Sequence, residues 1–358
     1  MMKNFDSDFV SSSYLANLRK FNPSDRTEFL DHLQKVYNYK LNTDFPLILH
    51  IEPTNDCNQT CRMCCHPTMK RRKTHISDEI VKKAIEEASV YKPWSVQFFF
   101  FGEPFLNKKI FKYIGWAKNA NLRNISTTSN FTAIPKSKIK DVVSSGLDSI
   151  HISFEGLNRD HYRMVRGKDT FDKAKRNIEL LIEEKSKANS NLWISMTFVR
   201  TTESDEEIEK FSSYWRPLVN DLHISPQFEY RNGSENGERR QAIAQYQSER
   251  NDGNIMHSLL EDRVPCRQLW ARLVVTSNGE MTPCSQNIDA NLSLGNLSEI
   301  SIHDAWTSRR MQELRMEHIS NNFCSNSGKI CEACTDWDWS GKVDERPIIS
   351  GTKIEIES

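Results

Sequence analysis

The stretch FPLILHIEPTNDCNQTCRMCC, residues 45–65, joins a short apolar run to a segment with four cysteines in nine residues. The apolar run is rich in strand-forming residues and has the length of one buried strand. The cysteines directly after it allow three kinds of site: a disulfide framework, a zinc site or an iron–sulfur cluster. The rest of the sequence has to decide among them.

The whole chain has 358 residues, with 48 basic and 48 acidic side chains. This length predicts one large domain and a smaller one. A formal net charge of zero argues against binding to bulk nucleic acid or to a membrane surface. The N-terminus has no apolar core of a signal peptide, and no apolar run approaches the ~18 residues of a spanning helix. We therefore expect a cytoplasmic protein, in which nine cysteines favour metal ligands over disulfides.

Strand-like and helical segments alternate between residues 45 and 230. Six segments resemble strands: 45–54, 94–104, 124–130, 148–156, 192–200 and 221–230. Five segments between them show helical spacing of apolar residues: 77–90, 107–120, 136–146, 170–187 and 203–215. Because a crossover between parallel strands needs a helix, this order predicts an α/β fold with a parallel sheet, either open or part of a (βα) barrel.

Polar motifs follow the ends of the first four predicted strands. They are NDCNQTC (55–61), GEP (102–104), TTSN (127–130) and the segment 153–156. The carboxyl ends of parallel strands meet at one edge of the sheet, where such folds bind their ligands. This clustering indicates a functional site.

The composition changes after residue 230. Residues 231–261 are polar and read as an insertion or linker. A hairpin pattern then surrounds the turn pair Asn278-Gly279. A helix-like segment, 301–318, leads to a second cysteine group, CSNSGKICEAC (324–334).

Cys57, Cys61 and Cys64 form a CxxxCxxC motif, with Cys65 adjacent. Structural zinc sites close with four protein ligands, usually in paired units. Three thiolates from one loop with no fourth partner nearby instead fit a [4Fe–4S] cluster with one open iron, to which a small molecule can bind.

This motif after a first strand resembles the signature of the radical S-adenosylmethionine (radical SAM) enzymes. GEP resembles the family's GGEP, with Phe101 in place of the first glycine. TTSN (127–130) stands where the family often has TNG. ISFEG (152–156) resembles the family's ISLDG, with Glu155 in place of aspartate.

The resemblance implies a partial (βα)6 TIM-type barrel over residues 45–230, with the cluster and SAM at the ends of its strands. In such enzymes the reduced cluster cleaves SAM to methionine and a 5′-deoxyadenosyl radical, which removes a hydrogen atom from the substrate. The cofactor carries out this step, while the protein positions the substrate and excludes water. An electron donor such as flavodoxin or ferredoxin is implied as a partner.

The resemblance also implies residue roles. Cys57, Cys61 and Cys64 would ligate the cluster. The implied SAM contacts are the backbone at Met63 for the adenine, Gly102 and Glu103 for the methionyl amine, Ser153 for the ribose, and Arg166 for the carboxylate.

The C-terminal cysteines resemble the auxiliary-cluster extension called SPASM, in its shortened twitch form. Cys266 and Cys284 flank Gly279, and the CxxC pair Cys331/Cys334 follows. This resemblance implies a second [4Fe–4S] cluster in a domain over residues 262–340, which we expect to close the barrel mouth. A structural zinc ribbon is the alternative.

Two cysteines remain. We interpret Cys65 as a small buried hydrophobe. Cys324 could replace one of the auxiliary ligands, and either thiol could serve as a hydrogen donor in catalysis.

Three function classes follow. The first is a radical SAM enzyme that dehydrogenates or epimerises a small polar metabolite such as a sugar, aminocyclitol or nucleotide sugar. The second acts on a ribosomally made precursor peptide; the predicted helical extension over residues 1–44 is short for a peptide-recognition module. The third is a non-catalytic zinc-binding protein. Residues 341–358 are interpreted as a tail.

Overall fold

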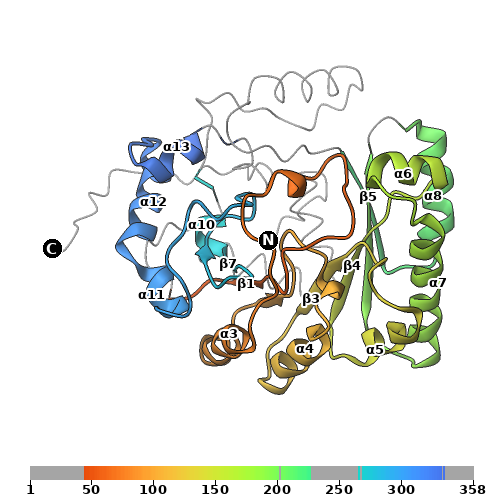
Figure 1. The fold of residues 1–358 in the computed structure, drawn as a ribbon, viewed down its shortest axis with the longest axis horizontal. Coiled ribbons are helices and arrows are strands. Elements are labelled where there is room, and N and C mark those ends of the chain that lie inside the picture. Colours follow the sequence, from red (N-terminus) through yellow and green to blue (C-terminus); the bar gives the residue numbers. More distant parts are fainter. Residues whose placement is uncertain (1–43, 201–202, 227–264, 267, 333, 335–358) are drawn as a thin grey trace, which may run out of the picture.

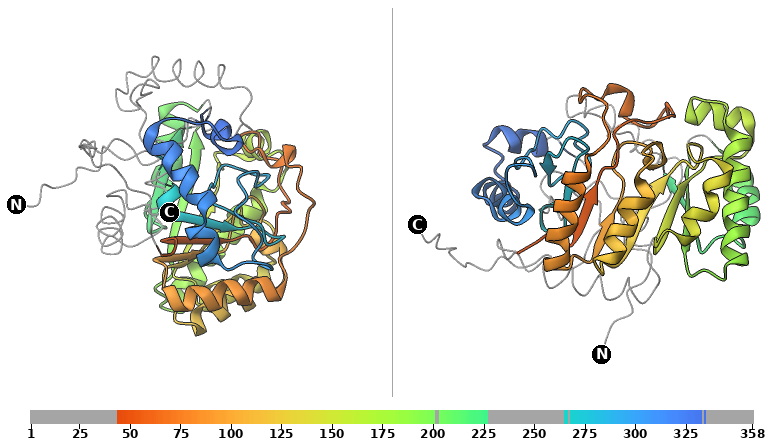
Figure 2. Two further views of the ribbon diagram at one scale, coloured as in Figure 1. Left: turned by 90° about the vertical axis from the view of Figure 1, so that its left-hand side faces the viewer. Right: turned by 60° about the horizontal axis from the view of Figure 1, so that its bottom comes forward.

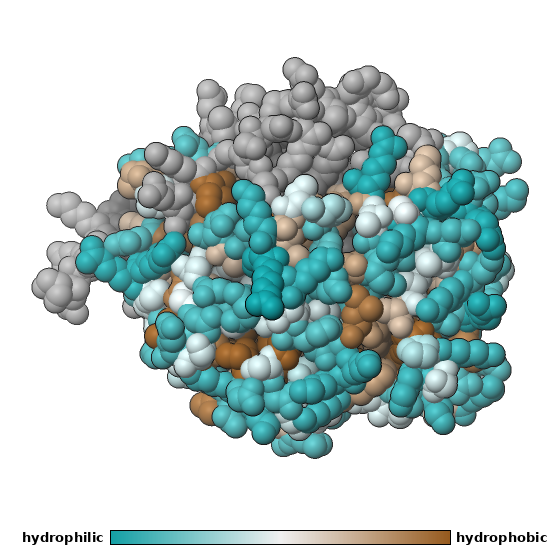
Figure 3. All heavy atoms as spheres, in the orientation of Figure 1, coloured by the Kyte–Doolittle hydropathy of each residue, from teal (hydrophilic) through white to brown (hydrophobic). Residues whose placement is uncertain are grey.

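The computed structural model describes residues 44–200, 203–226, 265–266, 268–332 and 334 (Figure 1). The predicted N-terminal extension, polar linker and C-terminal tail fall outside the described residues. Within the described part, no helix is long and apolar enough to cross a membrane. Figure 3 shows one face of the molecule, which is mainly hydrophilic with scattered apolar side chains.

One eight-stranded sheet organises the molecule, in the order β6-β5-β4-β3-β2-β1-β7-β8. The strands are β1 (Ile48–Ile51), β2 (Ser95–Gln97), β3 (Ile125–Ser129), β4 (Ser149–Ser153), β5 (Trp193–Arg200), β6 (Asp221–Pro226), β7 (Arg272–Val275) and β8 (Met281–Thr282). The first six are parallel and lie in chain order. The predicted α/β fold with a parallel sheet, the strand order of a partial (βα)6 barrel, is confirmed.

Helices follow the strands in alternation. In the first part they are α3 (Asp78–Tyr91), α4 (Ile110–Asn119), α5 (Ile139–Ser144), α6 (Arg159–Arg166), α7 (Phe171–Lys187) and α8 (Asp205–Trp215). Short 3₁₀ helices are η2 (His66–Thr68), η3 (Pro104–Leu106) and η4 (Lys136–Lys138). The predicted start at residue 77 is confirmed by the Ser77 hydroxyl, which accepts a hydrogen bond from the backbone N–H of Ile80.

The two faces of the sheet differ in chemistry. One face carries apolar side chains such as Leu49, Val96 and Ile150, which join the core under helices α3 to α8 (Figures 1 and 2). Because side chains alternate along a strand, the neighbouring residues Gln97 and His151 point to the opposite face. That inner face is polar and buried.

The C-terminal hairpin extends this sheet. Strand β7 pairs in parallel with β1, and β8 returns antiparallel to β7. Gly279 has φ +87° at the turn, a conformation that glycine adopts without strain. The predicted hairpin is confirmed. The sequence did not indicate that it would continue the sheet of the first domain.

Two helical features differ from expectation. The segment 301–318 contains two helices, α11 (Ile302–Thr307) and α12 (Arg309–Ser320), because Ser308 is extended between them and its hydroxyl caps α12. Helix α6 was not predicted. The remaining C-terminal helices are α10 (Gln268–Ala271) and α13 (Asn326–Glu332).

Candidate active site

The cysteine loop after β1 is held by the end of helix α6. The backbone N–H of Thr60 donates to the carbonyl of Arg166 at 3.2 Å, and that of Arg62 donates to the carbonyl of Val165 at 2.9 Å. The last carbonyls of a helix have no partner within the helix, so they are available for such bonds. Residues more than 100 positions apart in the sequence therefore shape one loop.

Gly167, which ends α6, allows this close approach. It has φ +74°, and a Cβ atom added there would lie 2.2 Å from the Thr60 hydroxyl oxygen. Both the backbone conformation and the lack of space require glycine.

Side-chain amides attach the same loop to the segment after β3. Asn58 Nδ2 donates to the Thr132 hydroxyl at 2.8 Å. Gln59 Nε2 donates to the hydroxyls of Thr132 at 3.1 Å and Thr170 at 2.8 Å. Asn130 Nδ2 donates to Asn58 Oδ1 at 2.9 Å. The polar residues that follow β3 thus hold the cysteine loop in place.

The three thiols of the motif are half-buried and interact electrostatically. Burial raises the pKa of Cys57 to about 12, and it raises the pKa of Cys61 as well. Arg166 opposes the shift at Cys61, because its Nη1 lies 3.4 Å from the sulfur. A hydrogen bond from the buried Cys65 lowers the pKa of Cys64 to about 7. The environment therefore favours the thiolate most at Cys64.

The three thiols supply the sulfur donors that an iron–sulfur cluster requires. Among the residues that the structure describes, no three His, Cys, Asp or Glu side chains converge to hold one metal ion. Zinc needs its sulfur ligands about 2.3 Å from one point. A four-iron cluster has several metal atoms, so its cysteines can stand further apart.

Glu103 is buried beside this loop, at 2% exposure. Its carboxylate accepts hydrogen bonds from the Ser129 hydroxyl at 2.7 Å, the Asn130 N–H at 2.8 Å and the Phe105 N–H at 3.2 Å. Its own N–H donates to the carbonyl of Asp56 at 2.8 Å. Burial nevertheless raises the pKa of Glu103 to about 7. The carboxyl is therefore poised to change charge near neutral pH.

Gly102 lies against the same loop. A Cβ atom there would lie 2.0 Å from the carbonyl oxygen of Thr54. Glycine is required because the two backbones touch. The GEP motif and the cysteine motif, predicted to share one edge of the sheet, are in contact.

Arg166 and Glu155 form a buried ion pair through Arg166 Nε and Glu155 Oε2. Arg166 is the last residue of α6 and is 6% exposed, while Glu155 is fully buried. The N–H of Val199 also donates to Glu155, at 3.2 Å. The residue that the sequence predicted to meet a carboxylate thus already pairs with one of the chain's own.

The other predicted SAM contacts lie around this region. Met63 is half-buried within the cysteine loop. Ser153 ends β4 on the inner face of the sheet, opposite Thr197 of β5. Each sits where the sequence placed it, at the carboxyl edge of the sheet.

The C-terminal cysteines are linked through α12 and the hairpin. The N–H of Cys266 donates to His318 Nδ1 of α12 at 3.3 Å. Gln268, just after Cys266, accepts bonds from Ser285, just after Cys284, at 2.9 Å and 2.7 Å.

Helix α13, which carries Cys331, packs on α12. The N–H of Cys334 donates to the carbonyl of Cys331 at 3.0 Å. The segments of Cys266 and Cys331 therefore contact α12, and the segment of Cys284 is joined to that of Cys266 through Gln268.

Cys324 differs from these four cysteines in its exposure and in its hydrogen bond. It is exposed, and its thiol donates to the carboxylate of Glu317 at 3.7 Å. The N–H of Ser325 donates to the same oxygen at 2.8 Å. Glu317 thus holds the start of α13 in place.

The roles of Glu52 and Arg71 were not predicted from the sequence. Glu52 follows β1 and is fully buried, and Arg71 reaches it from the segment after the cysteines. Arg71 stands in the run KRRK, which reads as an exposed basic cluster. No local signal could have shown that one of its members is buried.

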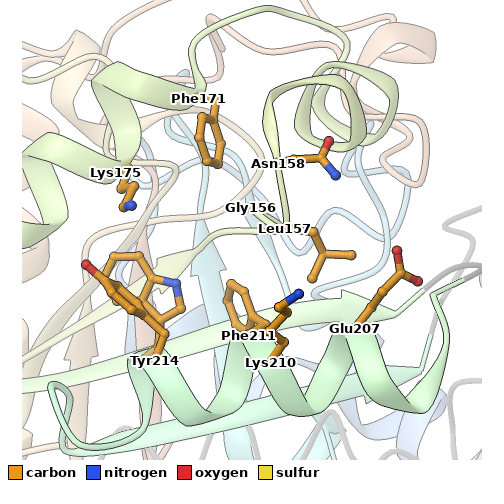
Figure 4. Close-up of a pocket in the computed structure, with 10 residues that line it drawn as sticks. Gly156, Leu157, Asn158, Phe171, Lys175, Glu207, Lys210, Phe211 and Tyr214 are labelled. Carbon is orange, nitrogen blue, oxygen red and sulfur yellow. The ribbon is translucent and has the colours of Figure 1, made fainter.

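A small cavity lies on the helix side of the sheet, between α7 and α8 (Figure 4). It has a volume of about 280 Å³ and is lined by Phe171, Phe211 and the side chains of Lys175 and Lys210. Its inner wall is the segment 156–158, directly after Glu155. None of the predicted site residues lines it.

Comparison with known proteins gives two family matches. The radical SAM superfamily matches residues 51–214, and the iron–sulfur cluster-binding SPASM domain matches residues 266–335. An uncharacterized protein of Methanocaldococcus jannaschii is 31% identical over 131 residues, covering 36% of this chain and 42% of that protein. A probable GTP 3′,8-cyclase of Methanothermobacter marburgensis is 27% identical over 135 residues, covering 37% and 44%. The chain thus spans less than half the length of these two curated relatives.

Solved structures share the fold. Streptococcus suis SuiB bound to S-adenosylmethionine has a TM-score of 0.59 at 17% identity, covering 86% of this chain and 76% of that one. The structure of SuiB bound to its precursor peptide SuiA has a TM-score of 0.58 at 16% identity, covering 81% and 70%. BtrN in complex with AdoMet and 2-DOIA has a TM-score of 0.50 at 15% identity, covering 82% and 94%.

Proposed function

The chain belongs to the radical SAM superfamily and carries a SPASM domain, and we propose that it removes a hydrogen atom from a small polar metabolite. It is an enzyme that uses S-adenosylmethionine and iron–sulfur clusters. The observation that carries the proposal is the contact between the cysteine loop and the GEP motif, which brings the Cys57 thiol within electrostatic range of the Glu103 carboxyl.

Cys57, Cys61 and Cys64 hold the first [4Fe–4S] cluster. Their support is the loop geometry: three half-buried thiols on a segment held from two sides by hydrogen bonds. When bound and reduced, the cluster supplies the electron that cleaves SAM and so generates the hydrogen-abstracting radical.

Glu103 receives the methionyl ammonium of SAM, supported by its burial and by its place against the cysteine loop. Arg166 keeps its ion pair with Glu155 and orients the SAM carboxylate with its remaining N–H groups, since a guanidinium has five donors. Gly102, Met63 and Ser153 complete the contacts with the amine, adenine and ribose.

Cys266, Cys284, Cys331 and Cys334 hold a second [4Fe–4S] cluster. Their support is the SPASM match, the contacts of the Cys266 and Cys331 segments with α12, and the bonds between Ser285 and Gln268. With four protein ligands this site is closed to substrate. Its role is to accept an electron, or to brace the C-terminal segment.

The polar inner face of the sheet supports a small polar substrate, such as a sugar or cyclitol, for dehydrogenation or epimerisation. The second candidate is a precursor peptide, favoured by the fold shared with SuiB, whose structure contains one. A flavodoxin or ferredoxin in the cytoplasm supplies the electrons.

The testing experiment measures metal content and SAM cleavage. Anaerobically reconstituted protein should contain about eight irons with sulfide, as two four-iron clusters require. With SAM and dithionite it should form 5′-deoxyadenosine. Cys61→Ala should abolish that product, while Cys65→Ala, which removes a neighbouring thiol outside the motif, should retain it.

Each contradictory result would refute a different part of the proposal. Zinc without SAM cleavage would refute the enzyme mechanism altogether. Four irons with cleavage would remove only the second cluster. Cleavage retained in Cys61→Ala would refute the ligand assignment.

A further inference from the structure

Gln97, Ser126 and Ser149 form a row across three neighbouring strands. The register pairs Gln97 of β2 with Ser126 of β3, and Ser126 with Ser149 of β4. Their flanking residues, such as Val96 and Ile150, join the apolar core on the other face. The three side chains therefore lie side by side on the inner face of the sheet. They are 0%, 1% and 3% exposed.

This row has unused hydrogen-bonding capacity. Within the described part of the chain, Gln97 Oε1, Ser126 Oγ and Ser149 Oγ are buried without a hydrogen-bond partner. Buried polar atoms in folded proteins are nearly always paired, because leaving one unpaired costs free energy. Three adjacent exceptions indicate that a ligand or ordered water completes them.

Neighbouring polar side chains on the same face behave differently. Ser95 donates to the carbonyl of Asn124 at 2.9 Å. His151 bonds through its two ring nitrogens to the hydroxyls of Ser195 at 2.6 Å and Thr197 at 2.7 Å. These two side chains therefore have their partners within the sheet. Beyond the row, the same face carries the buried residues Arg272 of β7 and His223 of β6.

The chemistry of the row is neutral. It offers one amide oxygen that accepts and two hydroxyls that both donate and accept. The row has no cationic group, and the Gln97 amide nitrogen already donates to the Ser95 hydroxyl at 3.2 Å, so a phosphate or carboxylate would find no charged donor there. Hydroxyl groups of a ligand, which donate and accept as well, match the row.

The row is distant from the cysteine loop. Ser126 precedes Asn130, which bonds to Glu103, by four residues, and Ser149 precedes Ser153 by four residues. Four residues of strand extend about 13 Å. A ligand group bound by the row thus lies deep in the barrel, away from the carbon that reacts.

We propose that Gln97, Ser126 and Ser149 form a deep subsite that hydrogen-bonds the hydroxyl-rich, uncharged end of the substrate. This inference rests on the proposed function and narrows it: the substrate is a polyhydroxylated molecule long enough to reach from the reacting carbon to the floor of the barrel. The row binds and orients this molecule, and it takes no part in bond breaking.

The first test needs no substrate. In reconstituted full-length protein, Ser126→Ala and Ser149→Ala should leave Tm unchanged or raise it by about 2 °C, because each removes an unpaired buried hydroxyl. Ser129→Ala in the same strand is the comparison. It removes a hydroxyl that donates to Glu103 and accepts from Phe131, so it should lower Tm. Equal losses of Tm in all three variants would show structural hydroxyls and overturn the subsite.

The second test uses myo-inositol, glucose, N-acetylglucosamine and UDP-N-acetylglucosamine as probes. At least one should accelerate 5′-deoxyadenosine formation by the wild-type enzyme. Gln97→Leu and Ser126→Ala should then raise the KM for that probe about tenfold, with kcat changed less than twofold. Exposed Ser213→Ala is the control and should match the wild type.

The outcomes separate the two proposals. Wild-type protein that forms no 5′-deoxyadenosine would overturn the proposed function and this inference together. Intact SAM cleavage that no probe stimulates would overturn the subsite alone. So would stimulation with an unchanged KM in both variants, and ordered water would then be the partner of the row.

Discussion

Arg71 binds Glu52 through both ends of its guanidinium, with Nη1 2.7 Å from Oε2 and Nη2 2.9 Å from Oε1. The pair is buried, and each member also meets the C-terminal region. The N–H of Ser277 donates to Glu52 at 2.8 Å, and Arg71 Nε donates to the carbonyl of Ile288 at 2.6 Å. One ion pair thus joins the segment after the first cysteines, strand β1 and the hairpin.

Arg71→Ala should destabilise the fold by about 3–5 kcal/mol, because it leaves the fully buried Glu52 carboxylate without its cation. The second iron–sulfur site should also bind less iron, because the hairpin loses its contact with the ion pair. Denaturant unfolding and iron content measure the two effects.

The exposed pair Lys138–Asp141 provides the control for this variant. Lys138→Ala should cost no more than about 1 kcal/mol, as exposed ion pairs usually do. Similar losses in the two variants would mean that burial of the Arg71 pair has no energetic consequence.

Gly167→Ala should lower iron incorporation and stability together. The added methyl group meets Thr60 in the cysteine loop and the residue keeps a strained positive φ, so either the loop or the end of α6 must move. Iron content after reconstitution and Tm are the measurements.

Gly115→Ala is the matched substitution in helix α4, where nothing lies within 4 Å of the added atom. It should stabilise the protein by about 0.5–1 kcal/mol, because alanine loses less chain entropy than glycine in a helix. Normal iron content in Gly167→Ala would show that the loop does not depend on that contact.

SAM affinity should rise with pH between 6 and 8. Because burial raises the pKa of Glu103 to about 7, the carboxyl is mostly protonated at pH 6 and mostly ionised at pH 8. A charged hydrogen bond to the methionyl ammonium contributes about 1.5–3 kcal/mol, so the affinity should increase about tenfold. Equilibrium binding of SAM to the reconstituted enzyme tests this.

Glu103→Gln should weaken SAM binding at pH 8 and remove most of its pH dependence. Without SAM the sign reverses for stability. The unfolded chain releases this proton near pH 4.5 and the folded one near 7, so wild-type stability should fall across that interval and the variant should be flatter. A pH-independent affinity in wild-type protein would exclude Glu103 as the ammonium partner.

Cys331→Ala should reduce iron from about eight to about four per chain, because one closed cluster is lost while the other remains. SAM cleavage without substrate should persist. Cys324→Ala, which removes a thiol bonded to Glu317, should leave iron unchanged. If Cys324→Ala lost the iron and Cys331→Ala did not, the two cysteines would exchange roles.

Most of the barrel could be predicted because its signals are local. The helix starts at Ser77 and Ser204 are marked by capping residues, and Ser204 forms a full capping box with Glu207. The strands alternate with these helices in the order of the chain. The polar residues that follow the strands are therefore expected to lie together at the carboxyl edge of the parallel sheet.

Helix α6 was missed although its ends carry ordinary signals. Asn158 caps its first turn and Gly167 ends it in the left-handed conformation. The resemblance singles out Arg166, which lies buried in the last turn of this helix. Its burial depends on Glu155, eleven positions earlier.

The pairing of β7 with β1 could not be predicted from local pattern. The partners Arg272 and Ile48 are more than 200 residues apart, and the sequence around one does not identify the other as its partner. The same holds for Arg71, whose neighbours in the sequence are all basic. Both features depend on contacts between residues far apart in the sequence, and local sequence patterns do not show such contacts.

The backbone and amide bonds that attach the cysteine loop to the end of α6 and to Thr132 are formed by groups other than the motif sulfurs. Metal delivery can therefore follow folding, in contrast to zinc fingers, which remain unfolded until their ion arrives. If oxygen destroys the cluster, the folded loop that binds it remains. Repair then requires only iron, sulfide and electrons, and the polypeptide need not be made again.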